Sequence, residues 1–124
     1  MAAQPQGVAT QPQGVKHAAM RGKGVVEYRL LRDEKVMLIE WIQAPPGEGG
    51  GLLAYAESLA RRWHATKVQL WTHVEPGEDE DTVLRRFNFF QRHGYRFVGL
   101  ERVDMPAGGS IVRFKREKVL VEDA

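Results

Sequence analysis

The sequence predicts a mixed α/β fold, a β-sheet flanked by helices in the order β-β-α-β-α-β-β. Two neighbouring apolar, β-branched segments, "VVEYRLL" (25–31) and "KVMLIEWI" (35–42), predict an antiparallel hairpin. A segment with helical periodicity and one with strict alternation follow, and a strand–helix–strand unit of this length predicts parallel neighbours with a right-handed crossover. A second helix-like segment and two strand-like segments close the chain.

Composition is that of a single globular domain. The chain has 124 residues, of which 43% are apolar and 27% charged. It has no cysteine, which excludes a disulfide framework and a thiol nucleophile and is typical of a reducing compartment. No apolar run is long enough to span a bilayer, and the first residues lack the apolar segment of a secretory signal. We therefore expect no membrane partner and a cytoplasmic location.

The charge is unevenly distributed along the chain. Lys16, Arg21 and Lys23 are the only charged residues in 1–24, and the whole chain carries +2, so residues 25–124 carry −1. A folded nucleic-acid-binding module normally has a concentrated basic face. Nucleic acid is therefore not an expected partner.

The first 24 residues differ in composition from the rest. The sequence "QPQGV" occurs at 4–8 and again at 11–15, with no large apolar residue nearby apart from valine. Such a segment buries too little surface to offset the entropy of ordering it. We expect a flexible tail over 1–24, a domain over 25–119 and a short C-terminal tail over 120–124. The alternative for the first segment is an extended arm that docks on a partner.

The first helix and the strands around it are predicted from hydrophobic periodicity. The almost continuously apolar segment 36–42 is typical of a central strand covered on both faces. Segment 67–74 alternates between apolar and polar residues, as a strand does. A helix is predicted over 52–65, because apolar residues recur there at helical spacing: Leu52, Ala56, Leu59, Ala60 and Trp63.

The second helix is predicted over 82–93. Acidic residues at 79–81 suit the positive end of a helix dipole, and Gly94 stands where a glycine often terminates a helix. Segments 95–105 and 110–119 are predicted as strands joined by "PAGG".

The order of these segments resembles the GNAT family, the GCN5-related N-acetyltransferases, over about residues 25–118. Three segments carry the resemblance: "GEGGGLL", similar to the family's glycine-rich acetyl-CoA loop, "KVQLWTHV", similar to the next strand, and "FNFFQRHGYRFVG", similar to the segment that ends the following helix. The resemblance implies a GNAT-like sheet and an acyl-CoA co-substrate, with acetyl-CoA expected. It would lie in a V-shaped opening between the central strand and its parallel neighbour.

A glycine-rich loop before a helix also has a physical reason to bind phosphate. Amides in the first turn of a helix are unpaired and favour an anion, and glycine lets the main chain approach a pyrophosphate. Together with the resemblance, which implies the residues outside this loop, the expected acyl-CoA-binding residues are Trp41, Ile42, Gln43, Gly47, Glu48, Gly49, Gly50, Gly51, Leu52, Asn88 and Phe90. The alternatives are a flexible turn for the glycines and a core position for Trp41, Ile42 and Phe90.

Two residues are candidates for the general base that aminolysis of a thioester requires. Glu40 lies mid-strand beside the expected opening, and His73 lies near the end of the parallel strand. The alternatives are a hydrogen-bonded structural glutamate and an ordinary surface histidine. The four histidines show no metal-ligand spacing with acids, so no metal is expected.

Several positions depart from the family pattern. Ala44 stands where the family's loop begins with glutamine or arginine, Pro45 and Pro46 lack amide N–H groups, and Phe90 replaces the tyrosine that commonly acts as the general acid. Two hypotheses follow. The chain is an acyl-CoA-dependent N-acyltransferase acting on an amine of a small molecule or protein, or a catalytically degenerate GNAT-fold module that binds or assembles partners. A homodimer is left open.

Overall fold

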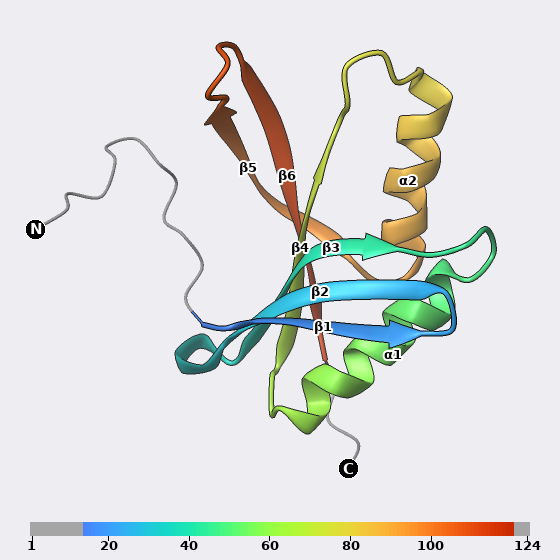
Figure 1. Ribbon diagram of the computed structural model, residues 1–124, viewed down its shortest axis with the longest axis vertical. Helices are drawn as coiled ribbons and strands as arrows, with labels where there is room; N and C mark the ends of the chain where they lie inside the picture. The colour runs from blue at the N-terminus through green and yellow to red at the C-terminus, as the bar shows by residue number, and fades with distance from the viewer. Residues whose placement is uncertain (1–13, 121–124) are drawn as a thin grey trace, which may run out of the picture.

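The computed structural model describes residues 14–120, which form one six-stranded sheet with two helices (Figure 1). The elements in chain order are β1 (Lys16–Arg21), β2 (Gly24–Leu31), a 3-10 turn (Arg32–Glu34), β3 (Val36–Gln43), α1 (Gly49–Arg62), β4 (Lys67–His73), α2 (Glu80–Arg92), β5 (Arg96–Asp104) and β6 (Ser110–Val119). In the sheet the strands are ordered β1-β2-β3-β4-β6-β5. The mixed α/β fold expected from the sequence is therefore confirmed.

The sheet contains one strand more than the sequence pattern indicated. β1 pairs antiparallel with β2, so that Ala19 lies opposite Val26, and the element order is β-β-β-α-β-α-β-β. The expected boundary at residue 24 was therefore wrong for residues 16–21. These residues are mostly small or charged, and they form a strand because β2 offers a free edge to pair with. The rest of the expected N-terminal tail, residues 1–13, lies outside the described residues.

The C-terminal boundary was also placed too early. Leu120 is buried in the core, and its N–H donates to the carbonyl oxygen of Thr66 at 2.8 Å. Leu120 therefore belongs to the domain. Residues 121–124 lie outside the described residues.

β3 and β4 are parallel and paired only at their N-terminal ends. Residues 36–39 pair with 67–70, and the ladder stops at Ile39 and Leu70. Beyond that point β3 stays with β2 while β4 stays with β6. The two halves of the sheet diverge there into a V-shaped opening (Figure 1). The first half of β3 is buried, as expected, but Glu40 and Trp41 are exposed where β4 no longer pairs with β3.

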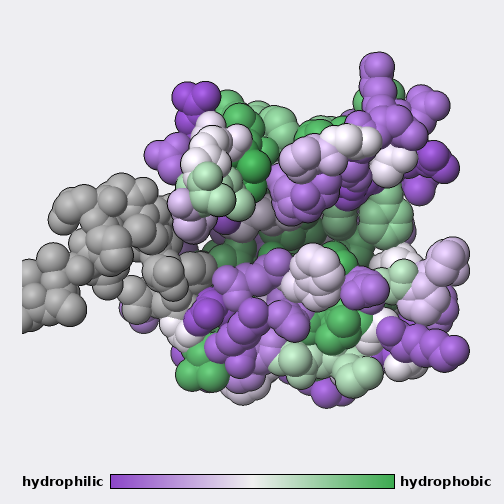
Figure 2. Space-filling view, turned by 45° about the horizontal axis from the view of Figure 1, so that its top comes forward, coloured by the Kyte–Doolittle hydropathy of each residue, from purple (hydrophilic) through white to green (hydrophobic). Residues whose placement is uncertain are grey.

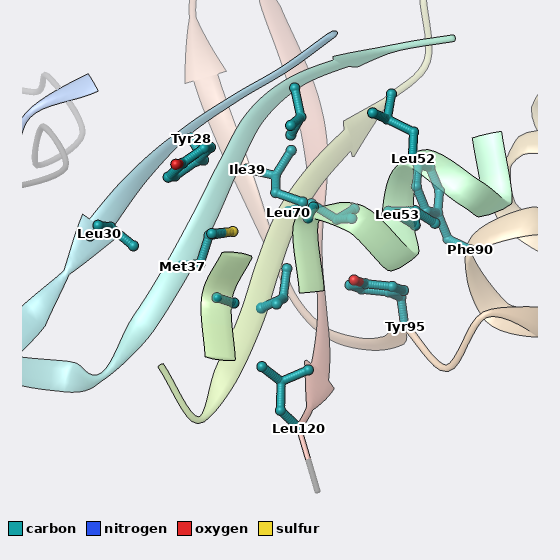
Figure 3. Close-up of a cluster of buried hydrophobic side chains, with 14 residues drawn as sticks. Tyr28, Leu30, Met37, Ile39, Leu52, Leu53, Leu70, Phe90, Tyr95 and Leu120 are labelled. Carbon is teal, nitrogen blue, oxygen red and sulfur yellow. The ribbon is translucent and has the colours of Figure 1, made fainter. Parts of the chain in front are cut away.

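The core lies between the sheet and α1. Buried side chains of β2, β3 and β4 meet Leu52, Leu53, Ala56 and Ala60 of α1, and Phe90 and Tyr95 close the cluster on the side of α2 (Figure 3). The alternation predicted for β4 is confirmed, since Val68, Leu70 and Thr72 are buried. Burial of apolar side chains between two layers is the main stabilising term of such a fold.

α2 is fixed at both ends by local interactions. The Asp79 carboxylate accepts a hydrogen bond from the N–H of Thr82 at 2.7 Å, so Asp79 is the N-cap. Gly94 adopts a positive φ of 91° directly after the helix, in agreement with the expected termination. Of the described residues, neither helix is long and apolar enough to cross a membrane.

Candidate functional site

The V-shaped opening continues into a large hollow. The hollow has a volume of about 2000 Å³ and is lined by both diverging strands, among them Glu40, Trp41, Ile42, Trp71 and His73, and by Phe90 of α2. Figure 2 shows a groove with hydrophobic residues on its floor and hydrophilic residues along its rims. Small-molecule pockets usually enclose about 300–1,000 Å³, so this one has room for a long ligand and a second reactant.

Glu40 lies at a β-bulge on the rim of this opening. Glu27 pairs with Trp41 and Tyr28 with Ile39, which leaves Glu40 as the extra residue of β3. Its Oε1 accepts from Nε of Arg29 at 2.9 Å, and its side chain is 25% exposed. Because the residue as a whole is exposed, its main chain is more accessible than its side chain. Oε2 has no hydrogen-bond partner in the described chain, so it is available to a ligand.

His73 lies on the opposite rim, at the end of β4. Its Nε2 is 2.5 Å from Oε1 of Glu75. When Nε2 carries the proton, it donates a hydrogen bond to this carboxylate. Nδ1 is then unprotonated and can accept a proton from a ligand. The carboxylate of an exposed glutamate thus orients the ring without burying it.

The loop after β4 is held by a second carboxylate. Arg86 of α2 forms two hydrogen bonds with Glu78, at 2.7 and 2.8 Å, and also donates to the carbonyl oxygen of His73 at 2.7 Å. The Arg86 guanidinium, helped by the N–H of Glu75, lowers the pKa of the Glu78 carboxyl to about 2. This contact joins α2 to the rim that carries His73.

The glycine-rich segment divides into two parts with different roles. Gly47 has a φ of 81°, and the N–H of Glu48 donates to the carbonyl oxygen of Pro45 at 3.0 Å. Proline at the second position and glycine at the third of a hydrogen-bonded turn fit a type II turn. Gly49, Gly50 and Gly51 instead form the first turn of α1.

Two of these helical glycines lie against other side chains, and the contact restricts the residue type most at Gly49, because the guanidinium near Gly51 is the far end of a flexible side chain. A Cβ on Gly49 would lie 2.9 Å from Cζ of Phe89, and a Cβ on Gly51 would lie 2.4 Å from Nη1 of Arg21. The glycines therefore let the end of α2 and the end of β1 approach the first turn of α1. This packing explains part of the segment without any ligand.

The first turn of α1 nevertheless presents free hydrogen-bond donors. Glu48, the N-cap, gives no side-chain cap, and the amides of residues 49–51 have no acceptor in the described chain. The Arg21 guanidinium lies against this turn and forms no ion pair with a described residue. Three free amides and one cation at the same place favour an anion.

The structure brings together only part of the expected site. Glu40, Trp41, Ile42, His73 and Phe90 line the hollow, whereas its lining includes none of the other expected residues: Gln43, Gly47, Glu48, Gly49, Gly50, Gly51, Leu52 and Asn88. Leu52 is a core residue, and Asn88 is exposed on α2. The glycine turn and the hollow are thus two parts of the molecule, connected by the last residues of β3.

Sequence reasoning missed Arg21 and the cluster on β4 and β6. The guanidinium of Arg113 lies 3.9 Å from the centre of the Trp71 ring and pairs with Glu101 at 2.8 Å. Residues on two strands distant in sequence face each other only once the sheet order is known. Arg21 likewise reaches α1 only because β1 is a strand, which the small residues around it did not indicate.

Solved structures share this fold at low sequence identity. A Bacillus subtilis acetyltransferase in complex with CoA matches with a TM-score of 0.60 at 16% identity, covering 84% of this chain and 75% of that chain. Aminoglycoside 6'-N-acetyltransferase complexed with coenzyme A matches with a TM-score of 0.60 at 15% identity, covering 86% and 73%. Nourseothricin acetyltransferase gives a TM-score of 0.59 at 17% identity.

The chain is shorter than these neighbours, covering only 56% of nourseothricin acetyltransferase with 77% of its own length. No family model and no curated protein matches the sequence. At this identity the similarity shows a GNAT-type fold, and it leaves activity and substrate to be argued from the site.

Proposed function

We propose that this chain, which has the fold of GNAT acetyltransferases, is an acyl-CoA-dependent N-acyltransferase with acetyl-CoA as its donor. The observation that carries the proposal is the divergence of β3 and β4 after Ile39 and Leu70. Main-chain N–H and C=O groups of a strand alternate in direction, so those of β3 that face away from β2 lack a partner strand there. An extended chain with amide groups, such as pantetheine, can pair with them.

The residues present fit the two ends of such a ligand. The three free amides of α1 and the Arg21 guanidinium suit a pyrophosphate. Ala44 stands where the family's loop begins with glutamine or arginine, and Arg21 supplies the positive charge that this alanine lacks. Phe90 forms an apolar wall of the opening. Phe89 packs closely on Gly49, so a phosphate would have to approach the turn from its Arg21 side.

A bound acyl-CoA would supply the thioester carbonyl that an amine attacks. The new C–N bond replaces the C–S bond, and the amine must lose a proton while the thiolate gains one. Glu40 and His73 line the hollow from opposite rims, and Oε2 of Glu40 and Nδ1 of His73 are our candidates for accepting the amine proton. Phe90 has no proton to give, so the thiolate would take its proton from solvent or from the protonated base.

Isothermal calorimetry on the full chain tests the binding step. We expect CoA to bind and Arg21→Ala to weaken it at least about tenfold, which is ~1.4 kcal/mol. Lys23→Ala is the matched control, because Lys23 is a cation in the same β1–β2 turn with no proposed contact. Pantetheine should bind equally to wild type and Arg21→Ala, since it lacks the pyrophosphate.

Turnover assays with acetyl-CoA and a panel of amines test the chemistry. We expect Glu40→Gln or His73→Asn to lower kcat by about 10²–10⁴-fold, the usual contribution of a general base, with little change in CoA affinity. Binding of CoA without turnover of any amine would favour the degenerate binding module. Absence of CoA binding at millimolar concentration would overturn the proposal as a whole.

A further inference from the structure

The outer edge strand β5 carries an unusual amount of exposed apolar surface. Phe97, Val98 and Leu100 are 54%, 41% and 61% exposed, and all lie within one nine-residue strand. No other described strand pairs with the outer edge of β5 (Figure 1). Exposed edge strands are usually protected by charges, proline or covering elements, because their free N–H and C=O groups invite pairing with another chain.

The two edge strands, β1 and β5, differ in whether each could pair with the same strand of a second copy of this chain. In an antiparallel pair of β1 strands around a two-fold axis, Lys16 of one copy would lie opposite Arg21 of the other. In the same arrangement of β5, the end that carries Arg96 would meet the end that carries Asp104. Like charges repel and opposite charges attract across such a pair. Self-pairing over the full length of the strand is therefore disfavoured at β1 and favoured at β5.

The register of a β5 pair follows from the same residues. Leu100 is the middle residue of β5 and the most exposed of its apolar residues, so a two-fold axis there places leucine on leucine. An axis at Glu101 or Arg102 would place like charges opposite each other instead. The bulge at Val98, between Phe97 and Gly99, leaves residues 99–101 regular for pairing on both copies.

We propose that β5 pairs with β5 of a second copy of this chain, antiparallel and centred on Leu100, to form a symmetric homodimer with a continuous sheet. Main-chain hydrogen bonds supply the pairing, and the apolar residues on β5 supply buried surface. Residues 101–104 of β5 also line the hollow that continues from the β3–β4 opening, so the dimer would place the second copy next to this hollow. The inference does not depend on acyl-CoA binding.

Sedimentation velocity on the full chain tests the dimer directly. We expect a reversible monomer–dimer equilibrium between about 5 and 500 µM, the behaviour of a small interface. Leu100→Lys should leave the chain monomeric over this range, because two lysines would meet at the axis. Leu84→Lys is the matched control, since Leu84 is a similarly exposed leucine on α2, and it should leave the equilibrium unchanged.

Charge reversal tests the antiparallel register. Asp104→Arg should weaken dimerisation at least about tenfold, because the new arginine would lie at the end of β5 that faces Arg96 of the second copy. Combining Asp104→Arg with Arg96→Asp should restore the monomer–dimer equilibrium of wild type, although neither substitution alone should strengthen dimerisation. A wild-type chain that stays monomeric at the highest concentration, or a dimer that Leu100→Lys and Asp104→Arg leave intact, overturns the proposal. Circular dichroism confirms that each variant is folded.

Discussion

The two helices of this protein are of similar length but differ in how deeply they enter the core. α1 packs against β2, β3 and β4 and has five buried residues: Leu52, Leu53, Ala56, Glu57 and Ala60. In α2 only Phe90 is buried, although Val83, Leu84 and Phe87 give it an apolar stripe. The same helical periodicity therefore accompanies two very different degrees of burial.

α2 is attached by specific contacts. Its first half is fastened to the loop after β4 by the Arg86–Glu78 pair, and its second half by the Phe87 ring, which packs edge-on against Phe114 at 5.5 Å. The guanidinium of Arg116 lies 5.1 Å from the centre of the same ring. A wall of the β3–β4 opening is thus held by a few polar and aromatic contacts.

The largest expected effect is the difference in stability loss between truncating a leucine of α1 and truncating a leucine of α2. Leu53→Ala removes a side chain that is 1% exposed, and we expect it to lower the free energy of unfolding by about 2–5 kcal/mol through lost burial and a cavity. Leu84→Ala, in α2, removes a leucine that is 48% exposed and should change it by less than about 0.5 kcal/mol. Urea denaturation followed by circular dichroism measures both. Equal effects would show that α2 is as deeply packed as α1.

A smaller effect is expected where α1 meets the end of α2. The Tyr95 hydroxyl donates to Oε2 of Glu57 at 2.9 Å, while Lys118 donates to Oε1 at 3.0 Å. Tyr95→Phe leaves the Glu57 carboxylate with one partner fewer in a buried position. We expect the free energy of unfolding to fall by about 1–3 kcal/mol at pH 7. Phe87→Leu, which removes an aromatic ring from α2 but no hydrogen bond, provides a comparison outside the core.

The Tyr95→Phe variant should also differ from wild type in how its stability depends on alkaline pH. Burial, followed by the negative charge of Glu57, raises the pKa of the Tyr95 hydroxyl. A raised pKa in the folded state gives stability that is complete below the unfolded value of about 10 and is lost as the pH rises above it. The stability of wild type should therefore decline above about pH 10 more steeply than that of Tyr95→Phe. Parallel pH profiles would contradict the buried hydrogen bond.

The sequence predicted the elements with strong periodicity and missed those that depend on a neighbour. The alternation in β4 was correct because burial enforces a regular pattern. On the predicted face of α1, Leu52, Ala56 and Ala60 are buried, whereas Trp63 lies past the end of the helix and is 42% exposed. β1 was missed because Ala18 and Ala19 pair with β2 without burying a large side chain. Exposed Leu84 shows the reverse case, in which an apolar stripe predicted more burial than α2 has.

The candidate site was less accessible to sequence reasoning. The V-shaped opening came from the family resemblance, since no local pattern marks the residue at which two parallel strands separate. The bulge at Glu40 requires knowledge of the partner strand, and Arg21 reaches α1 only through the β1–β2 hairpin. The glycines at 49 and 51 resemble a ligand loop in the sequence, whereas the structure also shows Phe89 packed closely on Gly49 and the flexible Arg21 guanidinium beside Gly51.

The smallest effect is expected at the polar attachment of α2. With the pKa of Glu78 lowered to about 2 by Arg86, its charged form contributes stability above the unfolded value of about 4.3, and the contribution is lost as the pH falls toward 2. Glu78→Gln should therefore lower hydrogen-exchange protection in α2 at pH 7 by less than about fivefold, as expected for a single, partly buried ion pair close to the surface. Protection in α1 should not change, because α1 does not contact this pair. The difference from wild type should shrink as the solution is acidified below about pH 4. Glu80→Gln, which removes a carboxylate without a described ion pair, is the control. A loss of protection that spreads equally to α1 would show that the two helices unfold as one unit, and would remove the distinction between a buried scaffold helix and a loosely attached wall.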